Sequence, residues 1–332
     1  MRILRVLIGT AALFAVAAPA AAASRADWDA CKGDDPDRSI AACTRIIQGR
    51  GESAKDSAIA HHERALAYKS KGDFDRAIAD LSEAIRLDPK YAEAYYLRGV
   101  AYRNKGGLDR AIADFSEAIG LAAELEAAHP ETIIRRLAHY NRGGAYANKG
   151  DFDRAIADFS EAIRLNPKSP EAYYNRAGAY GNKGDLDRAI ADLSEVIRLA
   201  PQVADARSDR AQFYQMQGNY ERAIADLNEA IRLDPKSAVA YNNRGSAYAF
   251  QGDIDHAIAD FSASILRRPG QRVPRQGRQR PRHRRFQRGD PARSQVRRRL
   301  LQPRPRLSLQ RRSGQGFGRC QRGEQPRSGG SL

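Results

Sequence analysis

The chain has 332 residues, a formal net charge of +16 and 42% hydrophobic residues, which is enough apolar material for a packed core. Residues 270–332 contain 19 Arg, no Lys and two acidic residues, so this segment carries +17 and residues 1–269 carry −1. The body of the chain is therefore close to neutral, which excludes the usual inference from a basic domain to nucleic-acid binding for that part.

Residues 1–23 have the layout of a secretory signal peptide. Two arginines precede an apolar run from Val6 to Ala18, and three alanines end the segment before Ser24. The run is shorter than the roughly 20 residues that span a bilayer, so cleavage after Ala23 is favoured over an uncleaved membrane anchor. We expect an exported protein that is periplasmic, or secreted as the second choice, with no membrane span after cleavage.

Residues 24–57 predict two short helices joined by the turn KGDDPD. Cys31 and Cys43 lie twelve residues apart on either side of this turn. An oxidising compartment favours a disulfide between them, which would contribute about 2–3 kcal/mol to stability. A metal site is a weaker alternative because no histidine or third cysteine lies nearby in the sequence, and two buried free thiols are the other alternative.

One phrase then recurs along the chain. It reads GDFDRAIADLSEAIRLDP from Gly72 and GDFDRAIADFSEAIRLNP from Gly150, and the copies follow at 34 residues with one gap of 44. A fixed period of this length predicts a solenoid of repeated units. Further copies begin at Gly106, Gly184, Gly218 and Gly252; the tyrosines four residues before each glycine are Tyr68, Tyr102, Tyr146, Tyr180, Tyr214 and Tyr248.

Each period predicts two antiparallel helices. A first helix carries small and apolar residues at helical spacing, a Gly-Asp turn follows, and the second helix ends at a proline in most copies. Neither helix can bury its apolar stripe alone, so adjacent units must stack. The alanines five residues after each glycine allow the paired helices to approach closely.

These units resemble tetratricopeptide repeats. The signature of the family is matched in the second unit at Gly99, Tyr102, Ala111, Phe115 and Ala118, and in the third at Gly143, Tyr146, Ala155, Phe159, Ala162 and Pro167. The resemblance implies an all-α solenoid, a right-handed superhelix of antiparallel helix pairs. It divides residues 58–271 into six units, 58–91, 92–135, 136–169, 170–203, 204–237 and 238–271, and makes residues 24–57 a degenerate capping unit.

The second unit contains the ten extra residues of the long gap. It lacks the closing proline and continues as GLAAELEAAHPETIIRRLAHY. The simple interpretation of residues 122–135 is a longer second helix that ends near His129, followed by a new helix from Pro130. The functional alternative is a local change in superhelix pitch that shapes a pocket.

Little in the sequence points to catalysis. There is no nucleophile motif, glycine-rich phosphate loop or metal-ligand spacing, and the adjacent His61 and His62 would point about 100° apart on a helix. We therefore expect no catalytic residue, metal or cofactor. One arginine and one aspartate recur in every unit, and we expect them to pair between helices: Arg64, Arg98, Arg142, Arg176, Arg210 and Arg244 with Asp80, Asp114, Asp158, Asp192, Asp226 and Asp260.

The resemblance also implies where a partner binds. In this family the first helices line the concave face, and tyrosine with asparagine in such a groove suits an extended peptide. The alternative is that these are ordinary solvated positions. The cations of the family's carboxylate-binding grooves are missing except for Arg103, which disfavours that type of ligand. The positions are Tyr96, Arg103, Asn104, Tyr140, Asn141, Asn148, Tyr174, Asn175, Asn182, Asn242 and Asn243.

The sequence thus predicts a non-catalytic scaffold that binds protein or peptide segments in a cell-envelope or secretion assembly. The folded part is expected to bind no nucleic acid, and no oligomeric state is assigned. Two alternatives are the binding part of an enzyme system, and a nucleic-acid binder that uses the arginine-rich tail, if that tail is genuine.

Residues 272–332 predict a disordered tail, and we interpret it as repeat sequence read in the wrong frame. Arg, Pro, Gly and Gln without Lys is typical of GC-rich codons read out of frame. Leu300 to Arg304 can be written CTA CTT CAA CCG CGG, which reads YFNRG one base later. Extended to Glu324, the shifted frame permits AYFNRGLAYRYNGDLAKALADVNEA, which resembles AYYNRAGAYGNKGDLDRAIADLSEV from Ala172. On this hypothesis the intact gene encodes further units, and Cys320 has no role.

Overall fold

A computed structural model describes residues 23–49, 51–126 and 133–267. All regular elements of these residues are α-helices, fourteen in number, and no strand occurs among them. The expected all-α fold of helix pairs is therefore confirmed. Residues 1–22 and 268–332 lie outside the described residues, and with them most of the expected signal peptide, the expected disordered tail and the reading-frame hypothesis.

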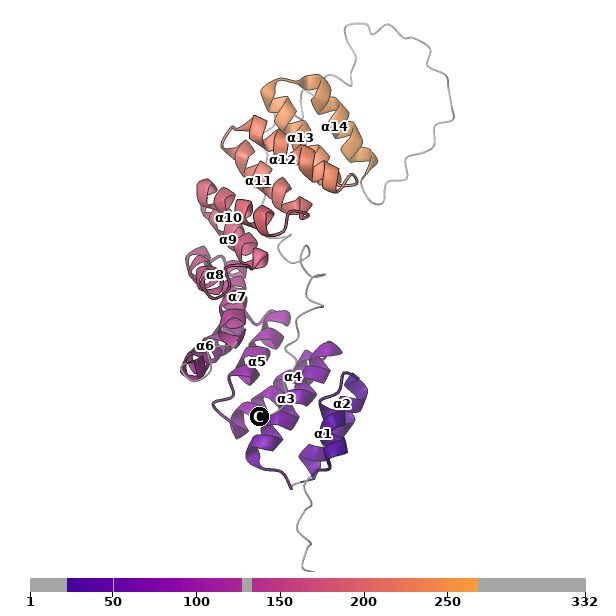
Figure 1. Cartoon of the computed structure of the whole chain (residues 1–332), viewed down its shortest axis with the longest axis vertical. Helices are drawn as coiled ribbons and strands as arrows, with labels where there is room; N and C mark the ends of the chain where they lie inside the picture. Colours follow the sequence, from indigo (N-terminus) through magenta and orange to yellow (C-terminus); the bar gives the residue numbers. More distant parts are fainter. Residues whose placement is uncertain (1–22, 50, 127–132, 268–332) are drawn as a thin grey trace, which may run out of the picture. The chain divides into compact units, whose positions relative to one another are not determined.

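The chain divides into two compact units, residues 1–124 and 125–332. In the first compact unit, helices α1 to α4 each contact the next helix along the chain (Figure 1). Helix α3 begins one turn before residue 58, where the side chain of Ser53 accepts a hydrogen bond from the backbone N–H of Asp56. The helices are α1 (Arg25–Cys31), α2 (Pro36–Gln48), α3 (Ala54–Ser70), α4 (Phe74–Leu87), α5 (Ala92–Asn104) and nearly all of α6 (Leu108–Glu126).

The second compact unit, residues 125–332, repeats the same arrangement. Each helix contacts the next one along the chain, and α7 with α9 and α11 with α13 also contact each other (Figure 1). We call α3, α5, α7, α9, α11 and α13 the first helices, and the helix after each of them a second helix. The helices here are α7 (Ile133–Asn148), α8 (Phe152–Leu165), α9 (Pro170–Lys183), α10 (Leu186–Leu199), α11 (Ala204–Met216), α12 (Tyr220–Leu233), α13 (Ala238–Gln251) and α14 (Ile254–Leu266).

Glycine and aspartate set the turn between the two helices of a pair. The six recurring glycines have φ between 77° and 86°, a left-handed conformation that other residues rarely adopt. Gly107 follows Gly106, but an aspartate or asparagine follows the other five glycines and caps the second helix: the side chain of Asp151, for example, accepts from the backbone N–H of Arg154. In these five turns the glycine and its capping residue therefore end one helix and start the next.

Proline sets the end of most second helices. Helices α4, α8, α10 and α12 each stop two residues before a proline, because the residue that precedes proline disfavours helical geometry. Ala123 takes the place of that proline in α6, and α6 continues to Glu126, so it has 19 residues where α4 has 14. The expected helix end near His129 and start at Pro130 lie outside the described residues.

The interior of each helix pair follows a simple volume rule. Gly99 faces the ring of Phe115, and a β-carbon there would lie 2.8 Å from it; Gly143 with Phe159 and Gly245 with Phe261 give 3.0 and 3.1 Å. The other three pairs have alanine and leucine at the same places, in tight packing. These pairs are Ala65 with Leu81, Ala177 with Leu193 and Ala211 with Leu227. A larger side chain on one helix is thus matched by a smaller one on the other.

The N-terminal hairpin closes the first unit. Cys31 and Cys43 are buried, and their sulfur atoms are paired at 2.04 Å. They pack with Ala42, Ile46 and Ala60, so α1 and α2 share a small core with α3. None of the helices in the described ranges is long and apolar enough to cross a bilayer.

The volume rule predicts that Gly99→Ala destabilises the fold by about 1–3 kcal/mol, because the added methyl group overpacks against Phe115. The double change Gly99→Ala with Phe115→Leu, which reproduces the pairs of the other units, should recover most of that loss. Urea unfolding measures both. Gly178→Ala is the control: no atom lies within 4 Å of a β-carbon there, so it should be neutral or stabilising by up to about 1 kcal/mol. Equal losses at both glycines would refute the rule.

Candidate functional site: the face of the first helices

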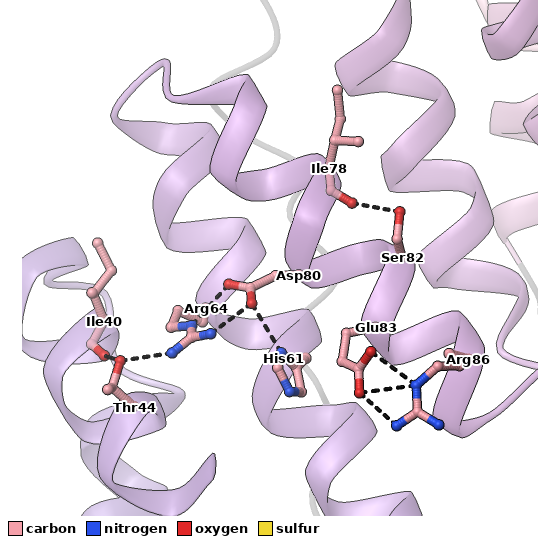
Figure 2. Close-up of polar contacts among 9 residues, drawn as sticks. All are labelled: Ile40, Thr44, His61, Arg64, Ile78, Asp80, Ser82, Glu83 and Arg86. Atoms are coloured by element: carbon pink, nitrogen blue, oxygen red, sulfur yellow. Dashed lines mark hydrogen bonds and ion pairs between the residues drawn. The ribbon is translucent and has the colours of Figure 1, made fainter. Parts of the chain in front are cut away.

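An arginine of each first helix pairs with an aspartate of the following second helix. In the first pair, Arg64 Nε donates to Asp80 Oδ2 at 2.8 Å and its Nη2 donates to Oδ1 at 2.7 Å (Figure 2). The other five arginines make the same two-pronged contact at 2.7–2.8 Å. The carboxylates are nearly buried. The pairing expected from the sequence is thus present in all six units.

The same guanidinium also reaches the preceding unit. Arg64 Nη1 donates to Thr44 Oγ1 on α2 at 2.9 Å, and the Thr44 hydroxyl in turn donates to the Ile40 carbonyl (Figure 2). Equivalent contacts link consecutive units through Arg98 with Ser82, Arg176 with Ser160, Arg210 with Ser194 and Arg244 with Asn228. One arginine therefore ties together three helices. The sequence prediction included the aspartate but not this second partner.

Histidine joins the pair in two units. Nδ1 of His61 lies 2.9 Å from Asp80 Oδ1, and Nδ1 of His139 lies 2.9 Å from Asp158 Oδ1. An ionised carboxylate only accepts, so this ring nitrogen carries the proton and donates. Three other units have tyrosine at this place, with the ring 5.5–5.6 Å from the arginine: Tyr95, Tyr173 and Tyr241.

These contacts govern the ionisation of the two aspartates. Burial is the largest single influence on Asp80 and Asp158 and would raise the pKa of each carboxyl. Hydrogen bonds from Arg64 and His61, and from Arg142 and His139, outweigh it and hold the pKa of both carboxyls below the ordinary value of 3.8. Both aspartates are therefore charged at neutral pH, as the paired arginines require.

Three of the predicted groove residues, Tyr140, Tyr174 and Asn175, make side-chain contacts between first helices. Asn175 Nδ2 on α9 donates to Tyr140 Oη on α7 at 2.8 Å, and Tyr174 Oη donates to Asp209 on α11. Each contact joins first helices of consecutive units. Asp209 was not expected at the site, although it lies at the register of Asn175, one repeat later.

The remaining predicted residues divide into packed and exposed ones. Asn141 is only 6% exposed and donates to the Leu137 carbonyl, so it does not lie open in a groove. The ring of Tyr96 packs 6.0 Å from that of Phe115, and that of Tyr140 packs 5.9 Å from Phe159. Arg103, Asn242 and Asn243 are half-buried, while Asn104, Asn148 and Asn182 are exposed at the ends of their helices.

The exposed asparagines have a regular setting. Asn182 Nδ2 donates to the carbonyl of Gly178, one turn earlier, at 2.8 Å, and Asn104 donates to that of Val100 at 2.9 Å. Gly178 leaves open space where a side chain would be. Tyr174, Gly178 and Asn182 therefore lie in one stripe along α9, with an aromatic ring at one end and an amide at the other.

The charges of the second helices compensate one another. Arg86, Arg164, Arg198 and Arg232 each pair with the glutamate three residues earlier on the same helix, and their side chains are well exposed. Such surface pairs add little stability, but they leave little net charge on these helices. In the residues that the structure describes, no cluster of three or more His, Cys, Asp or Glu side chains could hold a metal ion.

Comparison with known proteins matches this geometry to a family. A model described as "TPR repeat" matches residues 65–106 and 213–252, and two described as "Tetratricopeptide repeat" match residues 140–204 and residues 92–125 with 238–271. Together the matches cover more than half of the chain. The chain belongs to the tetratricopeptide repeat family. No curated protein matches its sequence significantly.

Solved structures of tetratricopeptide repeat proteins are similar to this one. YrrB, described as a TPR protein with an unusual peptide-binding site, has 26% identity and a TM-score of 0.50, over 60% of this chain and 96% of its own. A tetratricopeptide repeat protein from Parabacteroides merdae has 23% identity and a TM-score of 0.53, over 64% of this chain and 80% of its own. The C-terminal part of a TPR repeat-containing protein from Cytophaga hutchinsonii has 17% identity and a TM-score of 0.61, over 75% of this chain and 96% of its own. The last two show the fold alone.

Asp158→Asn should destabilise the protein by about 3–5 kcal/mol at pH 7, because it leaves the guanidinium of Arg142 largely buried and uncompensated. A carboxyl with a lowered pKa stabilises the fold above its unfolded value and loses that contribution as the pH falls below about 4. The difference in the free energy of unfolding between wild type and variant should therefore be smaller at pH 3 than at pH 7. Urea midpoints at both pH values measure it.

Asp153→Asn is the control, because the Asp153 side chain is 80% exposed and pairs with Lys183 at the surface. It should cost less than about 1 kcal/mol. Similar costs for the two variants, or a gap that widens in acid, would contradict the structural role of the Arg142–Asp158 pair.

Proposed function

We propose that this tetratricopeptide repeat protein is a non-catalytic scaffold whose first helices bind extended peptide segments of partner proteins. The observation that carries the proposal is the set of side chains along α7 and α9: Tyr140 and Tyr174 are half-buried, Asn148 and Asn182 are exposed at the helix ends, and no atom lies within 4 Å of a β-carbon at Gly178. Amides that both donate and accept suit a peptide main chain, and tyrosine rings give contact area at small entropic cost.

The distribution of charge supports the same proposal. The second helices neutralise their own charges, and six arginines of the first helices are committed to buried aspartates. The face of α7 and α9 thus selects by shape and by amide hydrogen bonds rather than by a strong electrostatic field. The peptide-binding site described for YrrB, at 26% identity, is consistent with this use of the fold.

The cellular place is part of the proposal. The signal-peptide pattern of residues 1–23 and the paired cysteines suggest an exported, periplasmic protein that takes part in an envelope or secretion assembly. Both features belong to the N-terminal part of the chain and are independent of the groove, so they can be tested separately.

A library of displayed unstructured peptides should yield binders for the full-length protein. The double variant Asn148→Ala with Asn182→Ala should weaken their binding roughly tenfold, since two amide contacts are lost, while circular dichroism stays helical. Arg198→Ala with Arg232→Ala is the matched control, because both arginines are exposed on second helices, and its binding should be unchanged. Failure to select any peptide, or a loss in the control alone, would overturn the proposed surface.

The export proposal predicts the redox state of the three cysteines. Full-length protein purified from the exported fraction and unfolded without reductant should show one reactive thiol, that of Cys320, and three after reduction. Three thiols before reduction would show that Cys31 and Cys43 are not joined in the cell.

A further inference from the structure

The last two first helices end in large apolar side chains that are exposed. Met216 is the final residue of α11 and is 58% exposed, and Phe250 lies one residue before the end of α13 and is 67% exposed. Helices α12, α13 and α14 follow Met216 in the array, so its exposure does not arise because the array ends there. The earlier units have small or amide side chains at this register, namely Ser70, Asn104, Asn148 and Asn182.

The residue that follows changes in the same two units. It is a lysine in the first four units and a neutral glutamine in the last two, Gln217 and Gln251. Lys183 pairs with Asp153, which lies 30 residues earlier at the start of a second helix. Gln217 keeps the equivalent contact, since its Nε2 donates to Asp187 Oδ1 at 2.7 Å, but it brings no positive charge. The four lysines are Lys71, Lys105, Lys149 and Lys183.

Each exposed apolar residue has a carboxylate nearby, with a glutamine at the register where earlier units have a lysine. Asp187 contacts the glutamine next to Met216. The ring of Phe250 stacks on that of Tyr220, with centroids 5.5 Å apart and planes 8° from parallel, and Glu221 follows Tyr220 at an exposed position. The ends of α11 and α13 thus combine apolar surface with negative charge, whereas the ends of α7 and α9 combine amides with lysines.

We propose that the ends of α11 and α13 bind a large apolar side chain of an extended peptide, next to a lysine or arginine of that peptide. The inference rests on the proposed function and names the class of peptide. Exposed apolar side chains that gather on neighbouring helices mark interaction surfaces. Methionine adapts its shape to different apolar partners, and the stacked rings of Phe250 and Tyr220 offer a preformed aromatic contact.

The register connects this surface to the amides of the proposed peptide-binding face. Asn148, Asn182, Met216 and Phe250 hold one place on four consecutive first helices. Helix α7 contacts α9, a side-chain hydrogen bond joins α9 to α11, and α11 contacts α13. A peptide that crosses these helices therefore meets amides, which suit its main chain, and then apolar groups and carboxylates, which select its side chains.

Unstructured displayed peptides selected on the full-length protein should share a large apolar residue next to a lysine or arginine. The double variant Met216→Asn with Phe250→Asn has the residue of three earlier units at both places. It should weaken binding of these peptides roughly tenfold or more, because burial of the apolar side chain is lost, while circular dichroism stays helical. Leu266→Asn is the matched control, since this apolar residue of α14 is 63% exposed, and its binding should be unchanged.

The charge requirement has a variant of its own. Gln217→Lys with Gln251→Lys restores the lysines of the earlier units. This change should weaken binding of the same peptides severalfold at low salt and much less at high salt, because salt screens charges at the surface. Equal binding of wild type and variant at low salt would overturn the requirement for a lysine or arginine.

Met216 also reports the contact directly. The chain has two methionines, and the other, Met1, lies in the expected signal peptide. With an isotope label at the methionine methyl groups, a selected peptide should shift the NMR signal that Met216→Asn removes. The same peptide with serine in place of its apolar residue should leave that signal where it is.

Two failures can be told apart. Peptides that bind without a shared apolar residue, leave the Met216 signal unmoved and bind the double variant fully would refute this inference, while the proposed function would stand. Failure to select any peptide would refute both.

Discussion

The array depends on the hydrogen bonds that the arginine of each first helix makes with the second helices on its two sides. Its guanidinium donates twice to an aspartate of its own repeat, as Arg64 does to Asp80. A further nitrogen donates to a side chain of the preceding repeat, as shown by Arg64, Arg98, Arg176, Arg210 and Arg244. Buried ion pairs often add little net stability, because desolvation offsets the attraction. They do fix geometry, since a planar fork satisfies a carboxylate in only one orientation. The arginine thereby sets how each first helix lies against the second helices on its two sides.

The packing of small residues makes this geometry possible. A guanidinium bridges three helices only if their axes approach closely, and the pairs of Gly99 with Phe115 and Ala65 with Leu81 keep the total side-chain volume nearly constant. With the backbones held at one spacing, side chains one repeat apart come into register on the first helices. The contacts of Asn175 with Tyr140 and of Tyr174 with Asp209 follow from that spacing. The surface proposed for peptide binding is therefore a product of the repeat interface.

Much of this could be predicted from the sequence, because the period fixes which residues share a register. The repeat period was enough to predict the helix pairs, the turns between them and the pairing of Arg64 with Asp80. The period did not predict the environment of individual side chains. Asn141 and Asn175 share a register, yet the first donates to its own helix and the second to Tyr140. For the adjacent His61 and His62 the sequence raises only the question of a metal site. In the structure His61 hydrogen-bonds to Asp80, and both ring nitrogens of His62 are buried without a hydrogen-bond partner.

The most direct test of the central claim is a double-mutant cycle between Ser160 and Asp192. These two residues belong to consecutive repeats, and both contact the guanidinium of Arg176. If the arginine joins the repeats as described, Ser160→Ala and Asp192→Asn should be coupled by about 0.5–1 kcal/mol in urea unfolding. The coupling should vanish in an Arg176→Met background. Costs that add within about 0.3 kcal/mol in the native background would contradict the claim that one guanidinium links neighbouring repeats.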